Sequence, residues 1–164
     1  MSKCLLGERV RYDAKIKQYP DLIKFISQHF DVKTVCPEVE IGLSVPRPAV
    51  QLYGTLDDIE VRGRDDPSID ITANINKYCH QYPPELNAIH GYIFKSKSPS
   101  CGIRDIPLFN HQGQITNSTM GVFAQAILQH YPNLPITDEQ GLLNPADCEH
   151  FLHQVKLYQQ KQIC

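Results

Sequence analysis

Apolar residues recur every three or four positions in four stretches of the chain, the spacing expected for one face of an α-helix. Two prolines mark helix ends: Pro20 suits the first turn of the first stretch, and Pro132 stops the third. The fourth stretch opens with Asn144 as the cap and Pro145 in the first helical position. The predicted helices cover residues 19–30, 70–82, 120–131 and 144–160.

Short apolar runs between these helices predict strands. The clearest run is residues 88–94, which is rich in β-forming side chains and is bounded by turn residues. Further strands are expected at residues 3–6, 31–35 and 134–136, and residues 46–54 are interpreted as a proline-rich loop. Because strands and helices alternate, the sequence predicts an α/β fold with a Rossmann-like, open and mostly parallel sheet flanked by helices.

The composition is that of an ordinary globular protein. The chain has 164 residues, 41% hydrophobic and 21% charged, and residues 1–164 are expected to form one domain. A net charge of -2 argues against a protein that relies on the phosphate backbone of nucleic acids. The N-terminus shows no secretory signal, and no apolar run approaches the ~18 residues of a membrane span. We therefore expect no membrane association and a cytoplasmic location with reduced thiols.

Six cysteines carry the main chemical signal in the sequence. Three of them follow predicted strands: Cys4 lies in or at the end of the first strand, Cys36 follows the second, and Cys101 lies in the loop after residues 88–94. Ligands of parallel sheets bind beyond the carboxyl ends of the strands, so these thiols are expected to lie close together. The remaining cysteines are Cys79 and Cys148, on apolar helix faces, and Cys164, the last residue.

Three thiolates without a fourth leave a metal with one open coordination position, which is typical of catalytic rather than structural sites. The alternative is that the cysteines are buried and pack as small hydrophobic residues, and their spacing alone does not separate the two interpretations. The sequence contains no CxxC pair, so a zinc ribbon or a ferredoxin-type motif is not expected.

Residues near the cysteines offer further chemistry. Glu38 in the CPE motif is a candidate general acid or base beside a metal, or else a solvated loop carboxylate. Ser98 and Ser100 in the SPSCG loop offer hydroxyl groups to a ligand, or simply form a turn. Arg47 in the VPRP motif is a candidate substrate-binding residue or a partner of a cluster sulfide, or else a surface charge.

Four stretches together resemble the thiouracil desulfidase (TudS-type) family: CLLGERVRYD at 4–13, VCPEVEIGLSVPRP at 35–48, FKSKSPSCG at 94–102 and MGVFAQAILQHYPNLPITDEQGLLNP at 120–145. The resemblance covers nearly the whole chain in the same order, and the CPEV, VPRP and SPSCG motifs are specific in combination. It implies a 4Fe–4S cluster held by Cys4, Cys36 and Cys101, with a fourth iron free to bind the sulfur of a thiolated nucleobase.

The same resemblance implies the reaction. A thiolated base or nucleoside (thiouracil or thiouridine) would be hydrolysed without redox change to uracil or uridine and sulfide. The family's catalytic glutamate corresponds to Glu38, and its catalytic serine corresponds to Ser98 or Ser100, with Ser98 preferred. Ala14 stands where the family usually has glycine, so we expect the turn around it to differ.

Two segments, VEIGLSVPRP and LPITDEQGLLNP, are most similar to those of longer, two-domain relatives that act on thiouridine in tRNA. We expect the second domain of those relatives to be absent here, and the net charge is negative, so a free thiolated base or nucleoside is expected ahead of tRNA. The oligomeric state and the choice between 2-thio and 4-thio substrates stay open. Two alternative functions also stay open: a zinc-thiolate hydrolase using the same three cysteines, and a sulfur or iron–sulfur carrier or thionucleotide-binding module without turnover.

Overall fold

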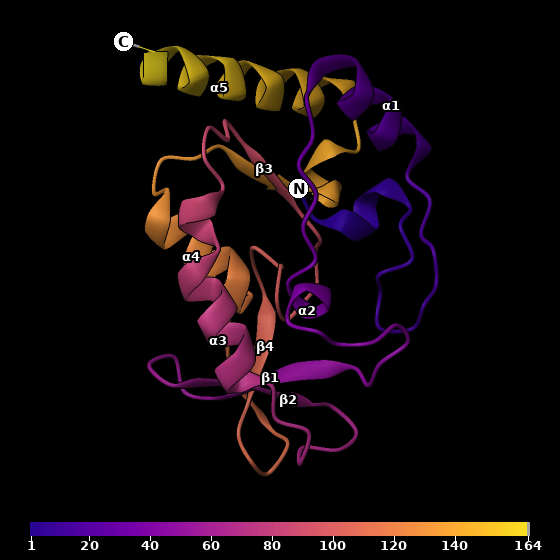
Figure 1. Cartoon of the computed structure of the whole chain (residues 1–164), viewed down its shortest axis with the longest axis vertical. Coiled ribbons are helices and arrows are strands. Elements are labelled where there is room, and N and C mark those ends of the chain that lie inside the picture. Colours follow the sequence, from indigo (N-terminus) through magenta and orange to yellow (C-terminus); the bar gives the residue numbers. More distant parts are fainter. Residues whose placement is uncertain (164) are drawn as a thin grey trace.

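The computed structural model describes residues 1–163, which form helices around two small sheets (Figure 1). Cys164, the last of the six cysteines, lies outside the described residues. The α-helices are α1 (Pro20–His29), α2 (Pro37–Glu40), α3 (Thr72–Gln81), α4 (Val122–His130) and α5 (Pro145–Ile163). Short 3-10 helices are η1 (Lys3–Leu6), η2 (Pro83–Glu85) and η3 (Glu139–Leu142).

The strands are β1 (Val50–Gly54), β2 (Ile59–Gly63), β3 (Tyr92–Phe94), β4 (Ile106–Phe109), β5 (Ile115–Thr119) and β6 (Ile136–Asp138). The larger sheet has the order β2-β1-β4-β5. In it, β1 pairs with β2 and β4 with β5 in the antiparallel sense, whereas β1 and β4 are parallel. β3 and β6 form a separate parallel pair.

The α/β class is confirmed, but the prediction of a Rossmann-like, mostly parallel sheet is wrong. Both antiparallel pairs are hairpins whose strands are joined by a few residues, and such short connections permit only antiparallel pairing. Parallel pairing within residues 1–163 is limited to β1 with β4, β3 with β6, and an isolated bridge between Ser2 and Val35. A parallel arrangement exists, but it is only a few residues long.

The four predicted helices are confirmed, whereas the strand predictions were less accurate. Residues 3–6 form η1 instead of a strand, and residues 31–35 contribute only the bridge at Val35 because residues 31–34 lack a buried face. Residues 46–54 contain β1, where a loop was expected. The strands β2, β4 and β5 were also missed, although apolar residues alternate along β2 and β4.

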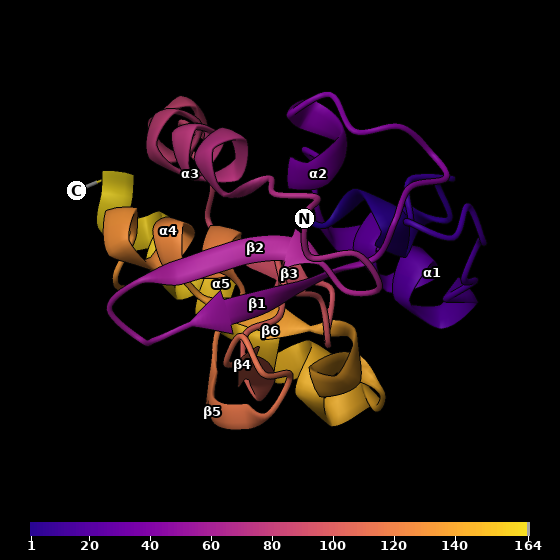
Figure 2. The ribbon, with the colours of Figure 1, turned by 90° about the horizontal axis from the view of Figure 1, so that it is seen from below.

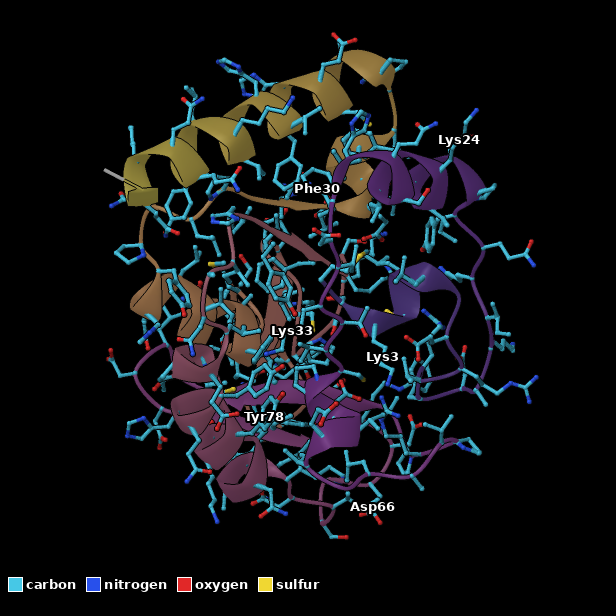
Figure 3. All side chains as sticks on the ribbon, turned by 45° about the horizontal axis from the view of Figure 1, so that its top comes forward. Lys3, Lys24, Phe30, Lys33, Asp66 and Tyr78 are labelled. Carbon is cyan, nitrogen blue, oxygen red and sulfur yellow. The ribbon has the colours of Figure 1, made fainter. Side chains whose placement is uncertain are left out.

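α5 lies across β3, and α1 lies beside α5 (Figure 1). Phe30, labelled in Figure 3, follows α1, and its ring centroid is 6.1 Å from that of Phe151 in α5. Gly91 permits the close approach of α5 because a Cβ at this position would lie 2.7 Å from a methyl group of Val155. No helix within residues 1–163 has both the length and the apolar character needed to cross a membrane.

The hairpin of β1 and β2 lies between α3 and the hairpin of β4 and β5 (Figure 2). A buried hydrophobic cluster fills this region, and its fully buried members are Leu52, Val61, Ile75 and Leu108. The packing fixes β1, and with it the VPRP segment that precedes this strand. The fold thus holds the loop containing Arg47 against the rest of the candidate site.

Candidate functional site

Three chain segments that run side by side lead into one cavity. The backbone N–H of Ser2 donates to the carbonyl of Ile93 (2.9 Å), and that of Lys3 donates to the carbonyl of Val35 (2.8 Å). The N-terminal residues therefore lie between β3 and the segment before α2. The cavity beyond these segments has a volume of about 330 Å³, and its lining includes Cys4, Cys36 and Cys101. The structure brings the three thiols together, and their role as cluster ligands stays a prediction.

Local turns set the direction of each thiol. Cys4 lies in η1, which ends at Gly7 with a left-handed φ of 80°. Cys36 precedes α2, which starts at Pro37, and the carbonyl of Cys36 accepts the N–H groups that start this helix. Cys101 lies in the loop after β3 and is 6% exposed. Cys4 and Cys36 thus lie next to the Ser2–Val35 bridge, whereas Cys101 is reached through the loop that follows β3.

The loop of residues 95–102 is held by the first turn of α4. The carbonyl of Ser100 accepts the N–H of Phe123 at 2.9 Å, so the loop satisfies a donor that has no partner inside the helix. Gly121 permits this contact because a Cβ there would lie 2.6 Å from the Ser100 carbonyl. The sequence analysis missed Gly121 as a site residue. Its position at the start of the predicted helix 120–131 could have indicated a close backbone contact.

The two serines of this loop make different contacts. Ser98 lines the cavity, and its Oγ accepts hydrogen bonds from the N–H groups of Ser100 (3.3 Å) and Cys101 (3.0 Å). Ser100 is 1% exposed, and its hydroxyl donates to Oε1 of Glu38 at 2.8 Å. Ser98 therefore supports the turn at the cavity wall, whereas Ser100 is buried against the carboxylate.

Glu38 also pairs with Arg47. The Nε of Arg47 donates to Oε2 of Glu38 at 2.8 Å, and Nη2 lies 2.7 Å from the same oxygen. Nη1 and Nη2 donate further to the carbonyls of Ser44 (3.3 Å) and Val10 (3.0 Å). The guanidinium group is thus bound by protein groups on every nitrogen. The predicted contact between Arg47 and a substrate stays a prediction.

A second buried carboxylate, Glu139, anchors the start of the loop. It follows β6 and accepts hydrogen bonds from Lys95 Nζ, the Ser96 hydroxyl and the Ser96 N–H (2.8 Å for the last). Burial acts to raise the pKa of Glu139, but the hydrogen bonds from Lys95 and Ser96 outweigh it and hold this pKa below its usual value. These residues were missed, although they lie within three positions of the ends of two predicted strands, which is where ligand-binding residues of such sheets occur.

Replacing Lys95 with methionine is expected to destabilise the cluster-free protein by about 3 kcal/mol at pH 7, because the Glu139 carboxylate would be left buried without its cation. The pKa of Glu139 is lowered in the native protein, so its contribution to stability is present above its unfolded pKa and is lost as the pH falls through the folded one. In the variant, a protonated Glu139 is tolerated. The difference in unfolding free energy between the wild type and Lys95→Met, measured by urea denaturation, should therefore become smaller toward acidic pH.

The double variant Lys95→Met/Glu139→Met is the control for this pair. Removing both charges leaves no uncompensated group and should recover part of the lost stability. A single Lys95→Met variant as stable as the wild type at pH 7 would contradict the assigned role of the pair.

The cavity lining is rich in cations: among the described residues it contains Lys3, Arg11, Lys17, Arg47, Arg64, Lys95 and Lys97, against the carboxylate of Glu38. Burial, with a smaller contribution from Cys36, raises the pKa of Cys4 to about 11. Burial is likewise the largest cause that raises the pKa values of Cys36 and Cys101. Metal ligation would therefore displace protons from the thiols, and the surrounding cations favour the resulting thiolates.

The donor set fits an iron–sulfur cluster. Thiolates are the usual ligands of such clusters, and here three come from three separate segments. Among residues 1–163, no three His, Cys, Asp or Glu side chains are arranged to hold a metal ion together. A cluster makes a different demand because each thiolate binds its own iron.

A buried hydroxyl near the cysteines also fits such a group. Tyr92 belongs to the same buried cluster of side chains as Cys101, and its hydroxyl has no hydrogen-bond partner among the described residues. Burial, and next the charge of Cys101, raise the pKa of Tyr92. A free donor of this kind is available to a sulfur ligand, since groups around metal ligands are usually hydrogen-bonded to them.

Replacing Tyr92 with phenylalanine is expected to stabilise the cluster-free protein by about 1 kcal/mol, because it removes a buried hydroxyl without a partner. The same substitution at Tyr131 is the matched control. That hydroxyl donates to the carbonyls of Pro83 (3.0 Å) and Leu86 (3.2 Å), so Tyr131→Phe should be destabilising. Urea denaturation under reducing conditions measures the unfolding free energy of both variants. Equal losses of stability would contradict the conclusion that the Tyr92 hydroxyl has no hydrogen-bond partner.

The turn around Ala14 has a backbone conformation that favours glycine. Ala14 has a φ of 53°, in the left-handed region, and its N–H donates to the carbonyl of Arg11 at 3.0 Å. The turn therefore has a conformation for which glycine is suited, at a strain of roughly 1 kcal/mol, and the expectation that it differs from the turn of the family stays a prediction. Arg11 and Tyr12 in this turn line the cavity.

The model of the 2-thiouracil desulfurase family matches residues 1–139 of the chain. Among solved structures, the [4Fe-4S]-dependent thiouracil desulfidase TudS is similar, with a TM-score of 0.67 and 25% sequence identity, covering 95% of each chain. No match was found among curated protein sequences. The matched range includes the three cysteines of the cavity and both loop serines, and the chain belongs to the 2-thiouracil desulfurase family.

Proposed function

We propose that the protein is an iron–sulfur-dependent desulfidase that converts a thiolated uracil, as the base or the nucleoside, to its oxygen form and sulfide. The observation that carries this proposal is the meeting of Cys4, Cys36 and Cys101 on one cavity together with Glu38 and Ser98. The similar protein TudS is a thiouracil desulfidase that depends on a 4Fe–4S cluster, which supports the same assignment here.

The three cysteines would hold three irons of a 4Fe–4S cluster and leave the fourth iron without a protein ligand. When bound, the cluster supplies a sulfur-seeking Lewis acid beside the cavity. The basic side chains of the lining would offset the negative charge of three thiolates. Thiols must stay reduced for this role, so we expect the protein to work in a reducing compartment such as the cytoplasm.

The reaction is a hydrolysis: the C=S bond breaks, a new C=O bond takes its oxygen from water, and sulfide leaves with the protons. Glu38 would accept a proton from the attacking water and return it to a leaving or ring atom. The oxygen of Ser98 accepts two backbone N–H groups, so its own hydrogen is available to orient the water or the base. A cavity of about 330 Å³ suits one small ligand, which favours a free base or nucleoside over tRNA.

Anaerobic reconstitution with iron and sulfide, followed by a sulfide-release assay, tests the function. The loaded protein should be brown and should release sulfide from at least one of 2-thiouracil, 4-thiouracil and 4-thiouridine. Protein that takes up no iron, or that binds zinc and releases sulfide without iron, would contradict an iron–sulfur enzyme. A loaded cluster with no turnover of any of the three compounds would instead indicate a carrier or a binding module.

A further inference from the structure

The carboxylate of Glu38 is held from two sides by residues on different loops. Its Oε2 receives the Nε–H of Arg47 and lies within 2.8 Å of two guanidinium nitrogens. Its Oε1 receives the hydroxyl of Ser100 at 2.8 Å. The Arg47 side chain is 5% exposed and that of Glu38 is 12% exposed, so this network is nearly shielded from water.

We propose that Arg47 and Ser100 are positioning residues that fix Glu38 in one orientation for the desulfidase reaction, and that neither contacts the substrate. This inference rests on the proposed function. Arg47 is poorly placed to bind a ligand because its nitrogens already donate to Glu38 and to the carbonyls of Ser44 and Val10. Ser100 is almost fully buried and uses its hydroxyl hydrogen on Glu38.

The geometry further assigns the reacting atom of Glu38. An ionised carboxylate oxygen can accept about two hydrogen bonds. Oε2 is covered by the guanidinium group, whereas Oε1 has accepted only the Ser100 hydroxyl. Oε1 is therefore the oxygen with a lone pair left for the proton of a water or substrate. A small rotation of the carboxylate would move this lone pair away from the reacting group, and misplacement by ~1 Å lowers rates by roughly 100-fold.

A double-mutant cycle separates positioning from substrate binding. Arg47→Lys keeps the charge but loses the planar fork that grips Glu38, so kcat should fall roughly 10- to 100-fold with little change in KM and iron content. In a Glu38→Gln background, Arg47→Lys should cause no further loss of kcat, because its effect passes through Glu38. Ser100→Ala should behave in the same way. Arg62→Lys, which alters an ion pair with Glu60 and Asp70 outside the cavity, is the control and should keep wild-type kinetics.

Arg47 would instead be a substrate contact if Arg47→Lys raises KM, or if its loss of kcat is fully retained in the Glu38→Gln background, and either result overturns the proposal. Thermal unfolding gives a readout that is independent of turnover. It is measured on the cluster-free wild type, Arg47→Lys, Glu38→Gln and the variant that carries both substitutions. The Arg47 substitution should lower the melting temperature less in the Glu38→Gln protein than in the wild type. If the wild type releases no sulfide, the proposed function fails. If the Arg47 and Glu38 substitutions are then coupled only in their melting temperatures, their ion pair is a structural contact and the positioning role is rejected.

Discussion

Replacing Cys101 with alanine is expected to abolish both cluster binding and desulfidase turnover while the chain still folds. Two thiolates would remain, and a cluster held by two protein ligands loses the anchorage that the third supplies. The fold should survive because alanine fills most of the space of this buried thiol, and the Cys101 N–H keeps its bond to Ser98 Oγ. Iron and sulfide analysis, visible absorbance and sulfide release measure the loss, and circular dichroism measures the fold.

Cys79→Ala is the matched control for Cys101. Cys79 lies on α3 outside the lining of the thiol cavity, and burial raises its pKa to about 12. Its replacement should leave iron content and turnover at the wild-type level. Normal iron content in the Cys101→Ala protein would show that this thiol is not a ligand, and the proposed site would have to be abandoned.

Replacing Glu38 with glutamine is expected to lower kcat by roughly 10²- to 10⁴-fold, the range typical for loss of a general acid or base. The amide has nearly the same shape but cannot take up a proton at neutral pH. Cluster content should stay unchanged, because Glu38 contacts Arg47 and Ser100 and is not one of the three thiol ligands. Single-turnover sulfide release, normalised to iron, measures the effect.

Glu40→Gln is a useful control for this substitution. Glu40 lies on the same short helix, α2, but is exposed and does not line the cavity, so its replacement should leave kcat unchanged. Wild-type kcat in the Glu38→Gln protein would exclude proton transfer by this carboxylate. A loss of iron in Glu38→Gln would indicate a role in holding the cluster instead.

The helices could be predicted from sequence because their signals are local. Residues 120–131 show the helical period of apolar side chains and end before a proline, and α4 covers Val122–His130 as expected. Asn144 caps α5, since its Oδ1 accepts the N–H of Asp147 at 3.0 Å. Such patterns repeat within one or two turns, so they need no knowledge of the distant chain.

The strands were harder to predict because they are short and depend on partners far away. Residues 31–35 look like a strand in isolation, yet only Val35 is paired. β1 was hidden in a proline-rich stretch and is recognisable from its pairing with β2 and β4. The mostly parallel sheet was inferred from the alternation of strands and helices. That alternation cannot reveal that two antiparallel hairpins make up the larger sheet.

The sequence by itself determined the family, the positions of the helices, and the motifs in which Cys4, Cys36, Cys101 and Glu38 occur, because each of these is encoded in residues that are neighbours in the chain. Only the tertiary structure decided which serine bonds Glu38 and that Arg47 grips the same carboxylate. It also decided that Lys95 and Glu139 form a buried pair. These contacts join residues 9 to 62 positions apart, and their geometry arises only when separate segments of the chain pack together.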